Sequence, residues 1–312
     1  MKKYSKVLSL ALAFVMLFAL CACGAAETPA AEPTAAPAAD APASEAPAET
    51  EAPAESQGVL DQIKADGVLY VPLSPDCAPM EFVDSSKAGQ EQYVGFDVTL
   101  AKYIAEYIGV DLVIEPMSFD ACQTAVYTGS VPMSISGYSW TEERSENYEI
   151  SDYYYAGDNE TEQVILIKKT DADKYTSAED FSGVDVGAQN ASLQMNLLTS
   201  QLPDANPITI GDLGVGVLEL QNGSIEALAV AKGNAEMILD SNPDLMICPW
   251  EFEVAAEYEA NIILITKGET ALLNTVNEAL AMAYADGLYG TWYEDAVALA
   301  KSENAAEVSV ED

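Results

Sequence analysis

Short apolar runs alternate along the chain with longer segments in which apolar residues recur every three or four positions. The short runs predict strands, and the longer periodic segments predict helices that bury one face. In the first block of this pattern we predict strands at 69–73, 110–115 and 131–136, and helices at 98–108 and about 120–129. The order β-α-β-α-β is typical of a parallel sheet with right-handed helical crossovers.

A second block of the same kind follows it. Here we predict strands at 164–168, 184–188, 208–210, 226–230 and 261–266, and helices from about 193, at 215–220, 270–285 and 288–299. Residues typical of helix ends support these boundaries, with Asp97 and Asp120 as expected N-caps and Gly109 and Gly287 as expected ends. A length of 312 residues suits two domains, so we predict an α/β protein with two lobes.

Residues 1–22 have the layout of a targeting signal. Three lysines stand among the first six residues, and the apolar run from Val7 to Leu20 is too short for a membrane span. The run ends in Leu20-Cys21-Ala22-Cys23, which resembles a bacterial lipobox and implies cleavage before Cys23 and lipidation of its thiol. Two alternatives stay open: a lipid on Cys21, or an ordinary secretory signal with two incidental cysteines.

Residues 23–57 begin with the expected lipidated cysteine and continue as a segment rich in Ala, Pro, Glu, Thr and Ser. Seven acids and no base occur at 25–57, and no large apolar residue is present. Such a segment cannot bury a core, so we predict a disordered tether. The tether would hold the folded part at the outer face of a membrane. At the other end, 303–312 reads as an acidic tail.

The charge balance narrows the possible partners. Acids outnumber bases by 51 to 13, which gives a formal net charge of −38. Nucleic acid and anionic lipid surfaces attract basic faces, so neither is an expected partner. The chain has no His, which excludes His-based triads and His metal ligands, and we predict no metal site and no cofactor. Three cysteines lie in the folded part (Cys77, Cys122 and Cys248), and we expect free thiols because an odd number shows no disulfide framework.

Five stretches of the folded part resemble, in the same order, the amino-acid-binding class of bacterial extracellular solute-binding proteins, the receptors of ABC importers. They are Val94-Gly95-Phe96-Asp97-Val98-Thr99-Leu100-Ala101, Met117-Ser118-Phe119-Asp120, Ser136-Gly137-Tyr138-Ser139-Trp140-Thr141-Glu142-Glu143-Arg144, Ile150-Ser151-Asp152-Tyr153-Tyr154-Tyr155, and Ala285-Asp286-Gly287 with Trp292-Tyr293. The resemblance implies a two-lobed periplasmic-binding-protein-like fold with two hinge crossings, near Gly157 and near 258–260. Lobe 1 would comprise 58–155 plus 262–302, and lobe 2 would comprise 157–257.

Arg144 is the first candidate for ligand binding because it is the only arginine in the chain. A guanidinium holds a carboxylate through two parallel charge-assisted bonds, which lysine cannot copy. Arg144 also follows the carboxyl end of a predicted strand, where open α/β sheets bind ligands. The resemblance implies that it clamps the carboxylate of a ligand. The alternative is a surface arginine paired with Glu142 or Glu146.

The resemblance implies further ligand contacts on the same loops. Candidate residues are Ser74, Phe119, Gly137, Tyr138, Ser139 and Trp140 in lobe 1, and Ser192 in lobe 2. Ser139 matches a hydroxyl donor to the carboxylate, and Gly137 matches a carbonyl that accepts the amino group of the ligand. Ser192 stands where lobe 2 offers a helix N-terminus, although a simple N-cap explains it nearly as well.

The aromatic candidates keep two interpretations each. Phe119 either lines the cleft or packs in the core. Tyr138 and Trp140 either widen an aromatic wall or lie buried against lobe 1.

Three positions depart from the family pattern. Cys77 and Met80 stand where members usually have aromatic rings, and Ala231 stands where members have an Asp that pairs with the α-ammonium of the ligand. Four explanations stay open for Ala231. The ligand lacks a standard amino group, another acceptor such as Asn234 replaces the Asp, a second anion faces Lys232, or the register is shifted.

The leading hypothesis is a lipid-anchored receptor that captures an amino acid or a similar small carboxylate-bearing solute by lobe closure and passes it to an ABC permease. We expect a monomer on the extracytoplasmic face of the cell membrane, without enzymatic activity. One alternative is a sensing or docking module for a membrane partner. A less favoured one is a dehydratase-like enzyme on the same scaffold. Its formal acid candidates are Glu81, Asp120 and Glu143, but we interpret Asp120 as a helix cap and the other two as surface acids.

Overall fold

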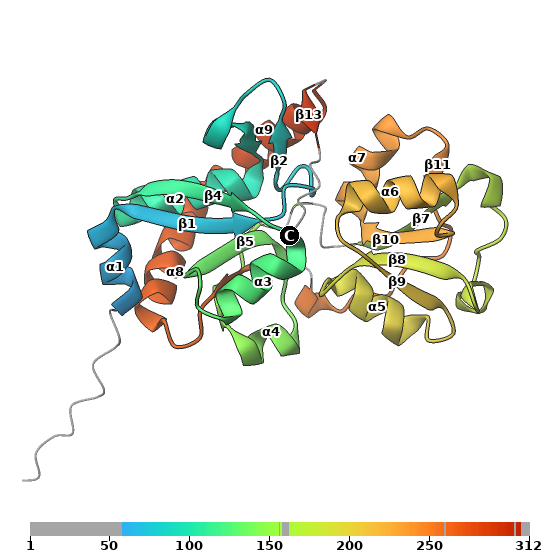
Figure 1. Ribbon diagram of the computed structural model, residues 1–312, viewed down its shortest axis with the longest axis horizontal. Helices are drawn as coiled ribbons and strands as arrows, with labels where there is room; N and C mark the ends of the chain where they lie inside the picture. Colours follow the sequence, from blue (N-terminus) through green and yellow to red (C-terminus); the bar gives the residue numbers. More distant parts are fainter. Residues whose placement is uncertain (1–57, 156, 158–161, 259, 303, 307–312) are drawn as a thin grey trace, which may run out of the picture. The chain divides into compact units, whose positions relative to one another are not determined.

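In the computed structural model of the chain (Figure 1), the described residues are 58–155, 157, 162–258, 260–302 and 304–306. The predicted signal segment, Cys23 and the tether lie outside the described residues, as does most of the predicted acidic tail. The described residues belong to one compact unit, and their strands form the sheets of two lobes. Of the predicted hinge crossings, the structure describes Gly157, Tyr258 and Ala260.

Lobe 1 is built on a parallel pair of strands, β1 (Val68–Leu73) and β4 (Asp111–Pro116), which helix α2 (Phe96–Ile108) connects. After helix α3 (Phe119–Tyr127), strand β5 (Met133–Ser139) lies next to β1. Side chains of β5 bind the backbone of the first strand: Ser134 Oγ donates to Pro72 O at 2.7 Å, and Ser136 Oγ accepts from Ser74 N at 3.0 Å. The predicted β-α-β-α-β order is therefore present, with β5 bound to β1 through its serines.

The end of the chain completes lobe 1. Strand β12 (Asn261–Ile265) pairs antiparallel with β5 and with the short β6 (Glu149–Ile150). Helices α8 (Thr270–Ala285) and α9 (Leu288–Ala300) pack against α2, so segments far apart in sequence lie side by side (Figure 1). The shared core follows the predicted periodicity, because Leu100 and Ile104 of α2 meet Leu272 and Val276 of α8 in one buried cluster.

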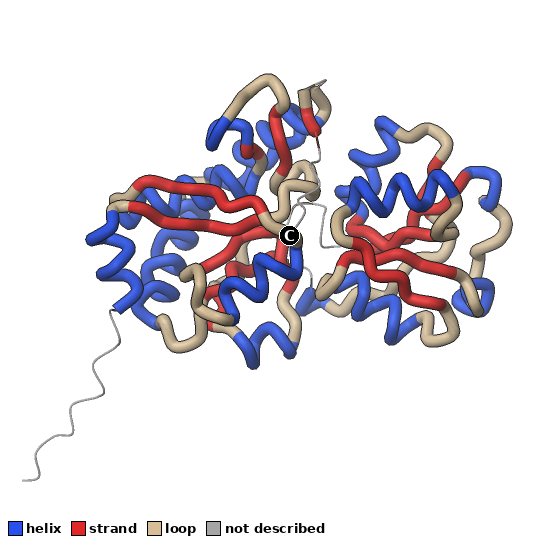
Figure 2. Tube along the Cα trace, in the orientation of Figure 1, coloured by secondary structure: helices blue, strands red, loops and turns tan. Residues whose placement is uncertain are grey.

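Lobe 2 contains one five-stranded sheet in the order β11-β7-β10-β8-β9. Its strands are labelled in Figure 1, and Figure 2 shows them in red among the helices in blue. Its strands are β7 (Gln163–Lys168), β8 (Asp185–Gln189), β9 (Asn206–Ile210), β10 (Ala227–Ala231) and β11 (Leu245–Ile247). Its helices are α5 (Leu193–Gln201), α6 (Leu213–Asn222) and α7 (Lys232–Ser241).

Both faces of this sheet are covered, which explains why its middle strand β10 is apolar throughout. Ile165 and Ile167 of β7 pack with α5 on one face, whereas Val164 and Leu166 pack with α6 and α7 on the other. Helix α5 therefore covers one side of the sheet, and α6 and α7 cover the opposite side.

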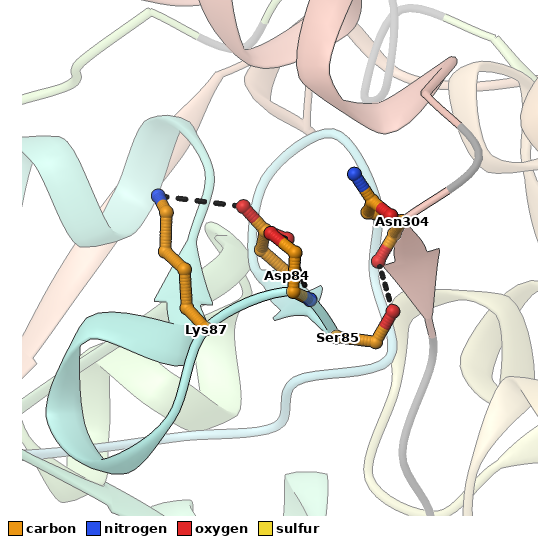
Figure 3. A network of polar contacts seen from close by, with 5 residues as sticks. Asp84, Ser85, Lys87 and Asn304 are labelled. Atoms are coloured by element: carbon orange, nitrogen blue, oxygen red, sulfur yellow. Dashed lines mark hydrogen bonds and ion pairs between the residues drawn. The ribbon is translucent and has the colours of Figure 1, made fainter.

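Several short elements were not predicted. They are α1 (Gly58–Asp66), α4 (Glu142–Asn147), α7, β6, β11, and a small sheet of β2 (Phe82–Asp84), β3 (Tyr93–Val94) and β13 (Ala305–Ala306). Most are too short for a periodic pattern to develop. The small sheet also depends on distant pairing: Ala305 lies opposite Asp84, and Ser85 Oγ donates to Asn304 O at 2.9 Å (Figure 3).

Both predicted aspartate caps are wrong. Helix α2 has Gly95 as its N-cap, because the backbone there has a φ of 124° and a Cβ would lie 2.2 Å from Met80 O. Asp97 lies inside the helix and is fully buried. The N-cap of α3 is Ser118, and Asp120 lies in its first turn, where it accepts from Ser118 Oγ at 2.8 Å and Asn190 Nδ2 at 2.7 Å.

Candidate functional site

Arg144 occupies the first turn of α4, where Thr141 is the N-cap and its Oγ1 accepts from Arg144 N at 3.1 Å. The side chain is only 4% exposed, so the interpretation as a surface arginine is wrong. The guanidinium donates to Ser139 O at 2.6 Å and to Gln123 Oε1 at 3.2 Å within lobe 1. It also donates to Ala191 O of lobe 2 at 2.9 Å. A buried cation therefore stands where the two lobes meet.

Two aromatic rings flank this guanidinium. Its central carbon lies 5.2 Å from the ring centroid of Tyr138 and 5.7 Å from that of Phe119. Such contacts favour a cation, more strongly when water is excluded. Tyr138 is fully buried, and Ser134 Oγ lies 2.8 Å from its hydroxyl, so the ring belongs to the lobe 1 core as well. Trp140 is half-buried and stacks on Tyr258 with centroids 6.3 Å apart.

A small cavity of about 30 Å³ lies between the strand ends of the two lobes. It has room for one or two water molecules, so a small solute can enter only when the lobes move apart. Five of the predicted site residues line it: Cys77, Phe119, Gly137, Ser192 and Ala231. The other lining residues are Ser136, Gln189, Gln194, Leu213, Ala229, Val230 and Asn234. Most of the polar side chains among them are neutral amides and hydroxyls.

The remaining predicted site residues lie elsewhere. Ser74, Tyr138, Ser139 and Trp140 are not among the residues that line this cavity. Arg144 lines a separate hollow of about 230 Å³, together with Asp120, Gln123, Glu143, Asn190 and Ala191 among others.

The turn before α5 keeps the shape that a helix-terminus contact requires. Ala191 adopts a φ of 56°, a left-handed conformation that an alanine rarely takes. Ser192 is the N-cap of α5, and its Oγ accepts from Met195 N at 3.1 Å. The simple cap is therefore present, and the same residue also lines the cavity.

Two buried acids bind the Ser136-Gly137 segment, Asp97 at Gly137 and Glu81 at Ser136. Gly137 adopts a φ of 56°, and its N–H donates to Asp97 Oδ2 at 2.7 Å. The same oxygen accepts from Tyr154 Oη at 3.1 Å. Glu81 Oε1 accepts from Ser136 Oγ at 2.7 Å. The interpretation of Glu81 as a surface acid is wrong, because both Glu81 and Asp97 are fully buried.

These two buried acids lie close enough to shift each other's pKa. Burial raises the pKa of Asp97 to about 7, and burial together with the nearby Asp97 raises the pKa of Glu81 well above its usual range. Glu81 Oε2 and Asp97 Oδ1 receive no other donor from the described residues. One proton shared between the two carboxyl groups would satisfy both oxygens, since two adjacent buried carboxylates cannot both ionise cheaply.

Ala231 ends β10 and is the N-cap of α7, so the structure places it at the cavity without a capping side chain. Lys232 is not among the lining residues and forms an ion pair with Glu162. Asn234 does line the cavity, and its Nδ2 donates to Ala78 O at 2.9 Å and to Cys77 Sγ at 3.2 Å. Because Lys232 pairs with Glu162 and does not line the cavity, the structure does not support the explanation in which Lys232 faces a second anionic group of the ligand.

In the part of the chain that the structure describes, Cys77, Cys122 and Cys248 form no disulfide with one another. Burial raises the pKa of Cys122 and of Cys248, which makes a thiolate at either position unfavourable. Within the described residues, no group of three or more His, Cys, Asp or Glu side chains is arranged to hold a metal ion.

Sequence reasoning missed several residues that shape the site. Gln123 and Gln189 contact it from helix and strand positions that carry no motif, and Asp97 was interpreted only as a cap. Asp76 is the clearest omission, because an acid in the turn that follows a strand of an open α/β sheet lies at the ligand-binding edge.

The chain is similar to one known protein family and to several named proteins. Residues 69–296 match the bacterial extracellular solute-binding proteins, family 3. A probable histidine-binding protein of Campylobacter jejuni is 26% identical over 72% of this chain and 82% of its own length. The L-cystine-binding protein TcyJ of Escherichia coli is 24% identical over 74% of this chain and 83% of its own length.

A solved structure is similar as well. The amino acid ABC transporter substrate-binding protein AbpA of Streptococcus pneumoniae, bound to L-arginine, has a TM-score of 0.70 and 30% identity. The match covers 78% of this chain and all of that one. Among the described residues no helix is both long enough and apolar enough to cross a membrane.

Proposed function

The chain belongs to the bacterial extracellular solute-binding proteins, family 3, and from this premise we propose that it is the lipid-anchored receptor of an amino acid ABC importer, acting as a monomer. Its relatives bind solutes rather than catalyse reactions, and TcyJ and AbpA are named for L-cystine and amino acid binding. The receptor captures a small solute that bears a carboxylate, closes over it, and delivers it to a membrane permease.

The observation that carries this proposal is the buried guanidinium of Arg144, which donates to carbonyl groups of both lobes. When the lobes part, the bond to Ala191 O of lobe 2 breaks, and a ligand carboxylate can take that place. The rings of Phe119 and Tyr138 lie beside the cation, and its burial strengthens a charge-assisted bond. A ligand that contacts both lobes favours the closed state by population shift.

The other candidates complete the proposed contacts. Gly137 lines the cavity and offers its backbone, Ser139 lies beside the clamp and offers its hydroxyl group, and the N-terminus of α5 at Ser192 favours a negative charge. Phe119 and Cys77 would border the ligand side chain. The wall at Cys77 would be thinner because it lacks the aromatic ring that family members usually have at this position. Ser74, Tyr138 and Trp140 would act indirectly, by fixing the loops that carry the residues in contact with the ligand.

A thermal-shift screen of the mature chain tests the proposed function. Amino acids, dicarboxylates and aromatic acids are the compounds to test. A ligand present at a hundred times its dissociation constant should stabilise the protein by about 2.7 kcal/mol. A panel in which no carboxylate stabilises the protein would contradict the proposal.

Lipidation at Cys23 gives the second prediction. In a bacterial host, the wild-type chain should sediment with membranes and carry acyl chains on its first mature residue. The variant C23S should lose both the lipid mass and the membrane association, because the thiol is the attachment point. The matched control C21S should keep them. Mass spectrometry of the mature N-terminus measures the mass of the attached acyl chains in each variant. A lipid that is retained in C23S but lost in C21S would place the lipidation site at Cys21 and contradict the prediction.

The neutral cavity wall at Ala231 gives a third prediction. A231D places a carboxylate at the N-cap of α7, which also suits the helix dipole. The new carboxylate should accept a charge-assisted bond from an α-ammonium, worth about 1.5–3 kcal/mol or roughly 10–100-fold in affinity. For each L-α-amino acid we compare its affinity with that of the same acid without the amino group. The ratio of these two affinities should be at least about 10-fold higher in A231D than in the wild type.

Calorimetric titration of each acid pair measures this ratio. A231N is the matched control, since it caps the helix without a charge. An unchanged ratio in A231D would mean that the ligand amino group lies away from β10.

A further inference from the structure

Asp76 lies in the turn after β1 and is 1% exposed. Its Oδ1 accepts from Ser74 Oγ of the same turn at 2.7 Å. Its Oδ2 accepts from Gln189 Nε2 and from Leu213 N, each at 2.8 Å. Gln189 and Leu213 belong to lobe 2, so a single lobe 1 carboxylate binds two elements of the opposite lobe.

The lobe 2 partners are well placed to hold such a carboxylate. Gln189 is the last residue of β8, and Leu213 is the first residue of the ten-residue helix α6. The backbone N–H groups at a helix start and the helix dipole favour a negative charge. Gln189 and Leu213 also line the cavity. The bonds to Asp76 therefore close one wall of the cavity.

We propose that Asp76 is a positioning residue that holds the two lobes closed over the cavity, and that closure takes up a proton at this carboxylate. The proposal rests on the lobe closure of the proposed function, but it depends neither on the identity of the ligand nor on Arg144. A ligand that closes the lobes would form its contacts in addition to those of Asp76.

The surroundings of Asp76 support proton uptake. Asp212 faces it from the start of α6, Glu81 faces it from the chain before β2, and Cys122 faces it from α3, so no cation among these neighbours stabilises its charge. Burial raises the pKa of Asp76 to about 6, although the bonds from Ser74 and Leu213 oppose this. In open lobes water replaces the lobe 2 partners, and the pKa returns towards its ordinary value of about 3.9.

The sign of the linkage follows from this difference. The closed state binds the proton more tightly, so closure is favoured most below the open-state pKa and loses that advantage as pH rises through about 6. Lowering the pH from 7.5 to 5.0 should raise the ratio of closed to open protein roughly tenfold.

Small-angle X-ray scattering of the ligand-free mature protein at pH 7.5 and 5.0 measures this ratio. The wild type should shift towards the closed state at pH 5.0. D76N keeps an acceptor oxygen but cannot titrate, so its ratio should stay constant with pH. D76A should be more open than the wild type at both values, because both bonds to lobe 2 are lost.

D120N is the matched control. Asp120 also bonds across the lobes, to Asn190, but it is half-buried. Partial burial raises the pKa of Asp120, yet the bonds from Asn190 and Ser118 outweigh it and lower that pKa, so it does not titrate in this range. D120N should therefore keep the response of the wild type. A wild type that does not respond, or a D76N variant that responds as the wild type does, would overturn the proposal. Thermal unfolding of each variant confirms that it is folded.

Discussion

Replacing Arg144 with alanine should abolish capture of the carboxylate ligand found by the thermal-shift screen. Truncating one partner of a buried, hydrogen-bonded charge pair costs about 2–5 kcal/mol, so affinity should fall by at least about 30-fold and by roughly 4000-fold at the upper end. The loss should be large here because Arg144 is 4% exposed and two aromatic rings lie beside its guanidinium. Calorimetric titration of the purified variant measures it.

The variant R144K tests whether the positive charge of residue 144 is enough for ligand binding or whether the planar geometry of the guanidinium is also needed. Lysine keeps the positive charge but cannot form two parallel bonds to one carboxylate. We expect R144K to recover little of the lost affinity. If R144K binds as the wild type does, the fork of donors has no role, and if R144A does so, the carboxylate lies elsewhere. Thermal unfolding is the necessary control, because Arg144 also bonds to Ser139 O and Gln123 Oε1.

The second large effect is expected at Asp97. D97A removes the acceptor of two buried donors, Gly137 N and Tyr154 Oη. Leaving a buried donor unsatisfied costs about 1–3 kcal/mol, so the variant should lose roughly 3 kcal/mol or more of unfolding free energy. For a chain of this size that corresponds to about a 10 °C fall in melting temperature. A melting temperature within about 2 °C of wild type would show that these bonds contribute little.

Glu81 provides the matched comparison for this pair. E81Q keeps an acceptor for Ser136 Oγ and a donor for Asp97, so it should melt close to the wild type near pH 5.5. Both acids have raised pKa values, so their contribution to wild-type stability is present at low pH and lost as pH rises through about 7. E81Q should therefore become more stable relative to wild type at pH 8. Equal pH profiles for the two proteins would exclude the shared proton.

The sequence was most informative where local pattern decides structure. The four-residue spacing of Leu100 and Ile104 in α2 and the apolar run of β10 follow from burial alone, and both were predicted. The cap predictions at Asp97 and Asp120 failed because tertiary partners compete for these carboxylates. Helix α7 was missed because it starts directly at the end of a strand, without a capping side chain.

The site shows the same difference between features that depend on local sequence and features that depend on long-range contacts. Arg144 stood out by its uniqueness and by its position after a strand, and both signals are local. Asp76 could not be assigned a partner in advance, because Gln189 and Leu213 lie 113 and 137 residues away. The shared proton of Glu81 and Asp97 likewise depends on a contact that no periodicity reports.

The central claim is that Arg144 holds a ligand carboxylate as the lobes close. The most direct measurement is a calorimetric titration of the wild-type protein with the best ligand from the screen and with its carboxamide analogue. The account predicts that the carboxamide binds at least about 30-fold more weakly, because a neutral amide offers the guanidinium one acceptor and no charge. Equal affinity for the two compounds would contradict it.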